Sequence, residues 1–271
     1  MTTSPTALRL QVFTGSAKAL QSTSTLISGA TEAVLIDAQF VLSDAKKLAE
    51  MVQASGKRLT TIYITHAHPD HFFGLPVLQA LFPQARIITS PEVLVHMQEM
   101  VKGKVAQWKP ILGDDLTDEP ILPTAYDSDT IELEAETLRL IHIGQGDMAD
   151  NTVVQIPSLQ ALIVGDMAYN GTHVWLAETD AASRQSWLHN LDRLSALAPQ
   201  IVVAGHKKAG NPDDGPAVLK ETIAYIHAFD QAVKASSSAE QLITKMNQTY
   251  ADRELPIVLQ LSANAAFGGG H

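Results

Sequence analysis

The sequence has 271 residues, 45% of them hydrophobic, and a formal net charge of −10. A chain of this size and composition can bury a sizeable core, and because no linker-like stretch divides it, we expect one domain over residues 1–271. The chain contains no cysteine, which excludes a disulfide framework and a thiolate metal site. Any transition metal would therefore have to be held by histidine and carboxylate side chains.

The acidic charge balance bears on the class of partner. The 19 lysine and arginine residues form no basic block, which argues against a nucleic-acid or anionic-membrane partner and favours a small-molecule substrate. The start of the sequence has no basic leader followed by an apolar core, and no apolar run is long enough for a membrane span. We therefore predict a cytoplasmic protein, with a homodimer as the base-rate expectation for its assembly.

The first third of the chain has the pattern of strands followed by a helix. Alternating apolar and polar residues predict an antiparallel meander with strands at 8–13, 24–28 and 33–37. A helix over 41–54 follows and ends at Ser55-Gly56, where a glycine suits the C-cap. The β-branched and apolar run at 59–64 predicts a buried strand.

Helical and strand patterns alternate in the rest of the chain. The predicted helices cover 72–82, 91–108, 183–197, 213–235 and 238–250, with Ser90 and Ser183 as N-caps. The predicted strands cover 86–89, 130–143, 152–156, 161–164 and 201–204. Residues 110–129 lack periodicity, and because such a long loop is usually functional, we predict that it forms a rim over the active site. The tail at 267–271 is predicted to be frayed.

The most informative stretch follows the strand at 59–64 and reads Thr-His-Ala-His-Pro-Asp-His. Side chains two positions apart in an extended segment point the same way, so His66 and His68 can present two imidazoles to one metal ion. Asp70 and His71 turn away from this pair after the proline, where a second ion can take both. The alternative, a polar surface cluster after a strand, is the weaker interpretation because this pattern of ligand-type side chains rarely arises by chance.

Three further strand ends carry polar residues next to glycine. They are Gly144-Gln145-Gly146-Asp147, Gly165-Asp166 and Gly205-His206. Together with the histidine motif, in this order and spacing, they resemble the metallo-β-lactamase fold superfamily over nearly the whole chain. The resemblance implies an α/β fold, a four-layer αββα sandwich, with a site for one or two metals at its edge.

The resemblance also implies a set of metal ligands in this sequence. The first ion would be held by His66 and His68, the second by Asp70, His71 and His206, with Asp166 bridging the two. Most of the family has a third histidine for the first ion, and this chain has Asp147, which we predict as the substitute ligand. Two divalent ions are expected, with zinc favoured. Three carboxylates also suit manganese or iron.

The Asp147 substitution leaves a second interpretation open. Asp147 could support the site without binding metal, so that the first position is weak and a single ion is bound. His142, five residues earlier in a strand, is the less favoured replacement ligand.

Several other polar residues admit both a functional and a structural interpretation. Asp37 either orients a ligating histidine or is a plain turn residue. His173 and Trp175 follow Asp166 closely enough to line a pocket, or they belong to a packed loop. Lys207 and Lys208 could bind a substrate carboxylate, although surface lysines are commoner. Structural or surface roles are expected for His96, His189 and His227.

The leading functional hypothesis is a metal-dependent hydrolase. In it a metal-bound hydroxide attacks a carbonyl of a lactone, β-lactam, ester or thioester, and Asp70 or metal-bound water shuttles the proton. Mononuclear iron chemistry of the persulfide dioxygenase type is an alternative, disfavoured because the ligands of a second ion are present. A degenerate, non-catalytic binding member of the fold is the third hypothesis, and the Asp147 substitution is its only support.

Overall fold

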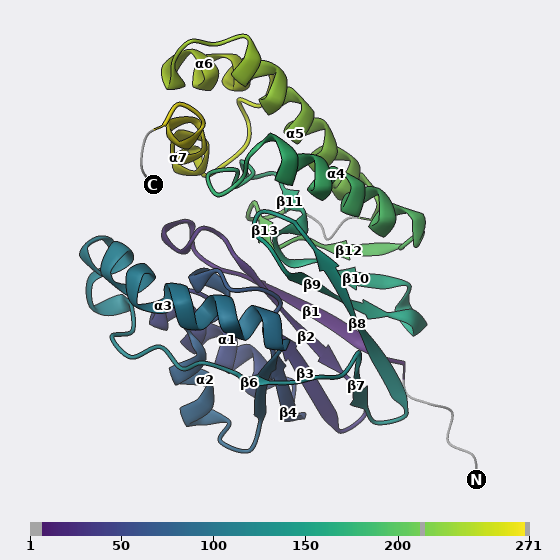
Figure 1. Cartoon of the computed structure of the whole chain (residues 1–271). Helices are drawn as coiled ribbons and strands as arrows, with labels where there is room; N and C mark the ends of the chain where they lie inside the picture. Colours follow the sequence, from purple (N-terminus) through teal and green to yellow (C-terminus); the bar gives the residue numbers. More distant parts are fainter. Residues whose placement is uncertain (1–6, 212–214, 269–271) are drawn as a thin grey trace.

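The computed structural model describes residues 7–211 and 215–268, and its strands form two packed sheets (Figure 1). The first sheet has, in spatial order, β1 (Arg9–Thr14), β2 (Thr23–Ser28), β3 (Glu32–Ile36), β4 (Arg58–Tyr63), β5 (Arg86–Thr89) and β6 (Thr124–Ala125). The second has β12 (Ile201–Val203), β10 (Ala161–Ile163), β9 (Asn151–Ile156), β8 (Glu136–Gly144) and β7 (Thr130–Leu133). A short parallel pair, β11 (Tyr169–Asn170) and β13 (His206–Lys207), extends from the second half.

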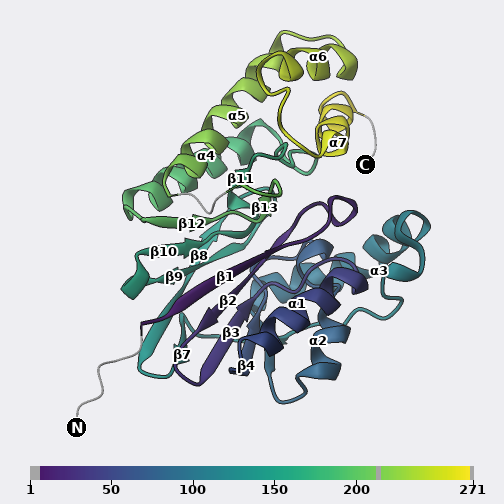
Figure 2. The same ribbon diagram turned by 180° about the vertical axis from the view of Figure 1, so that it is seen from behind.

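Helices cover the outer faces of both sheets, as Figures 1 and 2 show from opposite sides. On the first sheet these are α1 (Leu42–Ala54), α2 (Leu75–Leu81) and α3 (Pro91–Leu112). On the second sheet they are α4 (Ala181–Ala196) and α5 (Ala217–Lys234), which are followed by α6 (Ala239–Thr249) and α7 (Pro256–Ala266). The predicted αββα sandwich is confirmed.

The burial pattern explains why the sheets pack in this way. Every residue of β2 is buried, because both faces of the first sheet are covered. Between the two sheets lies an apolar layer that includes Ile27, Val34, Ile131 and Val154, all fully buried. One further apolar cluster lies between the first sheet and its helices, and another lies between the second sheet and its helices. Removing this apolar surface from water is the main force that holds the four layers together.

Most predicted elements are confirmed, with shifts at their ends. The antiparallel order β1-β2-β3 is the predicted meander, and β3, β4 and β5 continue in parallel. The N-cap of α4 is Asp180, which forms a capping box with Ser183, so the predicted cap is the third helical residue instead. The helix predicted from 72 begins at Leu75, after a 3-10 turn over Pro69–His71.

One predicted helix is longer than expected, and one helix near the end of the chain was missed. Helix α3 runs through Pro110 to Leu112, because a proline in the last turn costs few helical hydrogen bonds, and the predicted loop is correspondingly shorter. Helix α7 was not predicted, although its buried positions have helical spacing, because apolar residues such as Ile257 also stand on its exposed side and obscure the pattern. The start of the helix predicted from 213 and most of the predicted tail lie outside the described residues.

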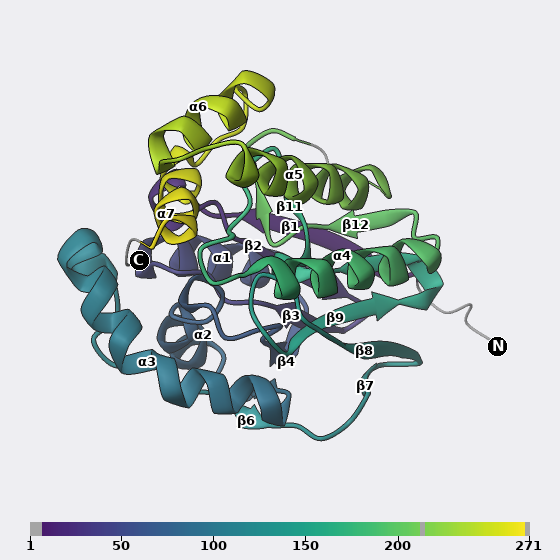
Figure 3. The same cartoon turned by 45° about the horizontal axis from the view of Figure 1, so that its top comes forward.

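The arrangement of the helices matters for the site. Helix α7 and the C-terminal half of α3 lie at the same end of the sandwich, on opposite outer layers (Figure 3). Residues from both helices line one pocket. Among the described residues, no helix has the length and apolar character needed to cross a bilayer.

A carboxylate ties the two sheets together at the opposite edge. Glu134, in the turn between β7 and β8, accepts hydrogen bonds from the backbone N–H groups of Thr31, Ala30 and Glu32 at 2.6, 2.9 and 2.9 Å. These three hydrogen bonds, first the one from Thr31, lower the pKa of Glu134 from 4.5 to about 2. A carboxylate with a depressed pKa in the folded state stabilises the fold at pH values above its unfolded pKa.

We predict that Glu134→Gln lowers the free energy of unfolding at neutral pH. Because the native carboxylate takes up a proton as the pH falls through about 2, its advantage over glutamine should shrink between pH 4.5 and about 2. Urea unfolding of both proteins across this range measures the difference. Glu136→Gln in the same hairpin is the control. If the difference in free energy of unfolding between the native protein and Glu134→Gln did not change with pH, this role would be contradicted.

Candidate metal centre

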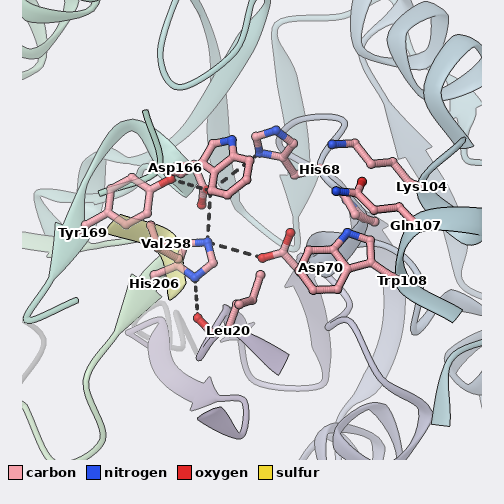
Figure 4. A pocket seen from close by; sticks show the side chains of 12 residues that line it. Leu20, His68, Asp70, Lys104, Gln107, Trp108, Asp166, Tyr169, His206 and Val258 are labelled. Atoms are coloured by element: carbon pink, nitrogen blue, oxygen red, sulfur yellow. Dashed lines mark hydrogen bonds and ion pairs between the residues drawn. The ribbon is translucent and has the colours of Figure 1, made fainter. Parts of the chain in front are cut away.

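The seven predicted ligands come together at one edge of the sandwich, where strands of both sheets end. His66 and His68 follow β4, and Asp70 and His71 belong to the 3-10 turn that comes next. From the second sheet, Asp147 follows β8 and Asp166 follows β10 in another 3-10 turn. His206 begins β13 of the short parallel pair. All seven are at most 5% exposed. Figure 4 shows four of them converging on one small volume.

Their ligand-type atoms form two groups. His66, His68, Asp147 and Asp166 make the first group, and Asp70, His71 and His206 make the second. Within each group one ligand atom from every residue lies within 4.8 Å of the others. A distance of this order suits several side chains that share one cation.

Asp166 contacts both groups. Its Oδ1 lies 3.1 Å from Nε2 of His71, and its Oδ2 lies 3.0 Å from Nε2 of His206. The same Oδ2 is 3.7 Å from Nε2 of His66 in the first group. The Tyr169 hydroxyl donates a hydrogen bond to Oδ2 at 2.8 Å. Asp166 thus has the position that a carboxylate shared by two cations would need.

Asp147, which the resemblance led us to predict as the substitute ligand, lies in the first group. Its Oδ2 lies 2.7 Å from Nδ1 of His68. Its Oδ1 accepts hydrogen bonds from the Met148 N–H at 2.9 Å and from the Asn151 amide at 3.3 Å, which fix the carboxylate. The side chain of His142 is 42% exposed and lies 3.4 Å from Asp129, so the structure places it outside both groups.

The two groups contain buried polar atoms that find no hydrogen-bond partner among the described residues. These atoms are Nε2 of His66 and His71, Oδ2 of Asp70 and Asp147, and Oδ1 of Asp166. Leaving a buried polar atom without a partner is costly, and five in one place are exceptional. Imidazole nitrogens and carboxylate oxygens are the donors that zinc and other divalent transition ions take in proteins. The donor set therefore fits divalent cations.

The charges within the groups strongly shift the pKa values of His68, His71 and Asp166. Burial alone would lower the pKa of His68 and His71, but nearby carboxylates, Asp147 for His68 and Asp166 for His71, raise both well above the usual value. Burial would raise the pKa of Asp166, but His206 and His71 hold it well below its usual range. Without a cation, protons thus hold this cluster together. A cation must displace them, so its affinity falls as the pH falls.

Each histidine is oriented through the ring nitrogen that faces away from the groups. Asp37 accepts a hydrogen bond from Nδ1 of His71 at 2.9 Å and another from the Thr65 hydroxyl, which in turn lies 2.9 Å from Nδ1 of His66. Nδ1 of His206 lies 2.6 Å from the Leu20 carbonyl oxygen. The orienting role predicted for Asp37 matches these contacts, and they leave Nε2 of His66, His71 and His206 directed at the centre, whereas His68 faces the centre with Nδ1.

Three neighbours of the site were not predicted. Glu178 lies 3.0 Å from Nε2 of His68 and accepts a hydrogen bond from Nζ of Lys104 on α3 at 2.7 Å. Tyr169 stacks on His206 with ring centroids 5.1 Å apart and planes at 1°. Nothing in the local sequence indicates the Glu178 contacts, because 110 positions separate it from His68 and 74 from Lys104. Tyr169, three residues after Asp166, could have been inferred from proximity.

A pocket opens beside the two groups and encloses about 430 Å³ of empty space, open solvent included. Its walls combine metal-ligand-type residues with apolar and aromatic side chains (Figure 4). The lining residues are Leu20, His68, Pro69, Asp70, Lys104, Gln107, Trp108, Asp166, Tyr169, Trp175, His206 and Val258. A concave, mostly apolar site with a few convergent polar groups is the usual form of a small-molecule pocket.

The remaining candidates divide between the pocket and the rest of the structure. Trp175 lines the pocket, whereas His173 lies 2.8 Å from the Tyr225 hydroxyl, and burial with help from Arg253 lowers its pKa to about 4. Lys208 donates to the Asp252 carbonyl, and neither Lys207 nor Lys208 lines the pocket. His96 pairs with Asp150, and His189 and His227 are exposed, in agreement with the structural or surface roles predicted for them.

Comparisons with known proteins agree with this architecture. A linear primary-alkylsulfatase from a Pseudomonas species is 25% identical over 246 aligned positions, which cover 74% of this chain but 44% of the alkylsulfatase, so the chain spans less than half of that relative. A type 2 metallo-beta-lactamase from a Bacillus species is 26% identical over 197 positions, covering 72% of this chain and 70% of the relative.

Solved structures show the same fold. A metallo-beta-lactamase family protein from Thermus thermophilus superposes with a TM-score of 0.66 at 21% identity, covering 96% of this chain and 91% of that one. A metallo-beta-lactamase from Pontibacter korlensis superposes with a TM-score of 0.60 at 19% identity, covering 81% and 94%. The family model described as the metallo-beta-lactamase superfamily matches residues 17–206, which include all seven predicted ligands, and the chain belongs to this superfamily.

Proposed function

We propose that this chain is a metal-dependent hydrolase that cleaves a small carbonyl substrate with two divalent cations. The observation that carries the proposal is the convergence of five buried, unpartnered nitrogen and oxygen atoms in two groups beside a pocket. Buried polar atoms without partners are few in folded proteins, and five of them gathered in one place call for an explanation. The side chains offered here are the donors that divalent transition ions take.

The ligand assignment follows the two groups. His66, His68 and Asp147 would hold one cation, Asp70, His71 and His206 the other, and Asp166 would contact both. Such ions lower the pKa of water toward neutrality and polarise a carbonyl group, which is the chemistry that hydrolysis needs. Zinc is our first choice, and the three carboxylates make manganese or iron acceptable.

We propose that Asp70 acts as a proton shuttle as well as a ligand. It lines the pocket, and its buried Oδ2 has no hydrogen-bond partner among the described residues. This oxygen lies 3.3 Å from Nε2 of His206. In a hydrolysis that adds one water across the scissile bond, Asp70 can take the proton from the attacking water and deliver it to the leaving group.

The substrate is proposed to be a lactone, β-lactam, ester or thioester. The acidic chain without a basic block supports a small molecule, and the mostly apolar walls with a few convergent polar groups have the chemistry of a small-molecule site. A sulfate ester is the second candidate, because the Pseudomonas relative is named an alkylsulfatase. Iron-dependent dioxygenase chemistry is less favoured, since the second group is complete. A cytoplasmic location and a homodimer stay predictions from the sequence.

Metal content tests the ligand assignment. Elemental mass spectrometry on protein purified without chelator should find near two ions per chain, falling toward one in Asp147→Ala and restored in Asp147→His, since an imidazole is an equally good donor. Asp129→Ala removes an exposed carboxylate that lies outside both groups, and it is the control. One ion or none in every variant would remove Asp147 from the centre and favour a single-metal or non-catalytic protein.

Hydrolysis itself is tested on a panel. We expect the native protein to cleave at least one of a lactone, a β-lactam, and the p-nitrophenyl esters of acetate and sulfate. Activity should disappear after chelation and return with zinc, manganese or iron. Asp70→Asn should lower kcat by about 10²-fold or more, in the range usual for a lost general acid or base. A metal-loaded protein that turns over none of the panel, and that consumes oxygen on a persulfide, would overturn the hydrolase proposal.

The orienting role of Asp37 gives an independent prediction. Asp37→Asn keeps the shape and tolerates the left-handed backbone conformation, φ 62°, but it weakens the bond to Nδ1 of His71. We expect metal affinity, measured by competition with a chromophoric chelator, to fall about 10–100-fold. The exposed Asp129→Asn serves as the control and should bind metal as the native protein does. Unchanged affinity in Asp37→Asn would show that this contact does not orient the ring for metal.

A further inference from the structure

The pocket beside the metal centre has an apolar side that the proposed chemistry does not use. Trp108 on α3 forms one wall and packs edge-on against the buried Phe40, with ring centroids 5.1 Å apart. Val258 on α7 and Trp175 belong to the other wall and to the apolar cluster under the second sheet. Leu20 packs against the clusters of both halves. The pocket therefore lies where the two apolar cores of the protein meet.

Figure 4 shows how these walls face each other. Lys104, Gln107 and Trp108 come from α3 on one side of the pocket, and Tyr169, His206 and Val258 lie on the other. Asp70 stands between the two sides, so a substrate whose reacting carbonyl is near Asp70 would extend the rest of its structure between α3 and α7. The apolar walls thus lie beside the reacting position rather than at a separate surface.

The charged residues in the pocket walls limit which substrate groups can bind in the pocket. Lys104 is the only lysine or arginine among the pocket-lining residues that the structure describes, and its ammonium group donates to Glu178 at 2.7 Å. Both partners are largely buried, with side chains 15% and 21% exposed. Their pairing leaves no uncompensated cation for an anionic group on the substrate. A carboxylate in this part of the pocket would lose its hydration without gaining a partner.

We propose that the substrate is an ester with an uncharged, apolar arm that lies between Trp108 and Val258, while its carbonyl faces Asp70. This inference rests on the proposed hydrolase function and narrows its substrate class. The arm gains free energy by leaving water for the apolar walls. Hydrolysis adds one water and releases a carboxylic acid and an alcohol, and either product can carry the arm.

Two substrate series test the proposal and show whether the acid or the alcohol part of the ester carries the apolar arm. The first is the p-nitrophenyl esters of straight-chain acids from acetate to octanoate, in which the acyl side grows. The second is the acetate esters of straight-chain alcohols from methyl to octyl, followed by proton release. In one series kcat/KM should rise by up to about fourfold per added methylene until the pocket is filled, as expected when each methylene leaves water. A flat or falling dependence in both series would overturn the proposal.

A matched pair of variants on α7 connects the trend to this pocket. Val258 is 4% exposed and lines the pocket, whereas its neighbour Ile257 is 49% exposed and does not. Val258→Asp should lower the ratio of kcat/KM for the longest ester to that for the shortest at least tenfold, and Ile257→Asp should leave this ratio as in the native protein. An equal ratio in all three proteins would overturn the proposal.

Two further checks keep the test decisive. If Val258→Asp does not fold, as judged by circular dichroism, Trp108→Phe replaces it. This variant should lower the ratio of kcat/KM for the longest ester to that for the shortest, because it removes apolar surface from the opposite wall. The failure of this inference is also distinct from the failure of the proposed function. Absence of hydrolysis on every substrate would remove the hydrolase function, whereas hydrolysis without chain-length dependence would remove only the apolar arm.

Discussion

The centre of this protein is a buried cluster of opposite charges, and the surrounding structure depends on keeping that cluster in place. Three carboxylates and four imidazoles lie at most 5% exposed at the edge of the sandwich. Burial of such groups is costly unless each is paired, hydrogen-bonded or bound to a metal. The buried carboxylates raise the pKa values of His68, His71 and His206, so protons can satisfy the cluster, and the proposed cations would satisfy it in their place. Its members form one connected unit, and we expect substitutions among them to be non-additive.

The supporting contacts explain how strand ends from two sheets produce one defined centre. Asp37 ends β3 in the left-handed region and thereby directs its carboxylate at Thr65 and His71 on the neighbouring strand end. The Leu20 carbonyl oxygen holds His206 from the other half of the molecule. These bonds cross between segments that are far apart in sequence. The centre is therefore rigid only when both halves are packed, and loss of either core should disturb it.

The sequence was sufficient for the parts of this structure that depend on local patterns. The alternation of β1 to β3, the apolar run of β4 and the histidine motif after it have short-range signals, and the structure contains all of them. The glycine pairs at 165 and 205 placed Asp166 and His206 correctly beside that motif. Contacts set by tertiary packing had no such signal. Glu178 and Lys104 meet only because α3 passes over the site, and α7 is apolar on the face that closes the pocket.

Asp147 links the chemistry of the centre to the choice of substrate. A carboxylate where most of the family has an imidazole adds a negative charge to a group that already contains Asp166, and Glu178 adds another behind His68. A formal charge of −3 from Asp70, Asp147 and Asp166 would offset most of the charge of two divalent ions. The remaining attraction for an anionic substrate is correspondingly small, and the paired Lys104 supplies none. Electrostatic recognition is thereby weakened on both sides of the pocket, so binding has to come from apolar contact. Asp147 as the proposed ligand and the apolar walls thus favour the same kind of molecule, one whose reacting group is neutral and whose remaining surface is hydrophobic.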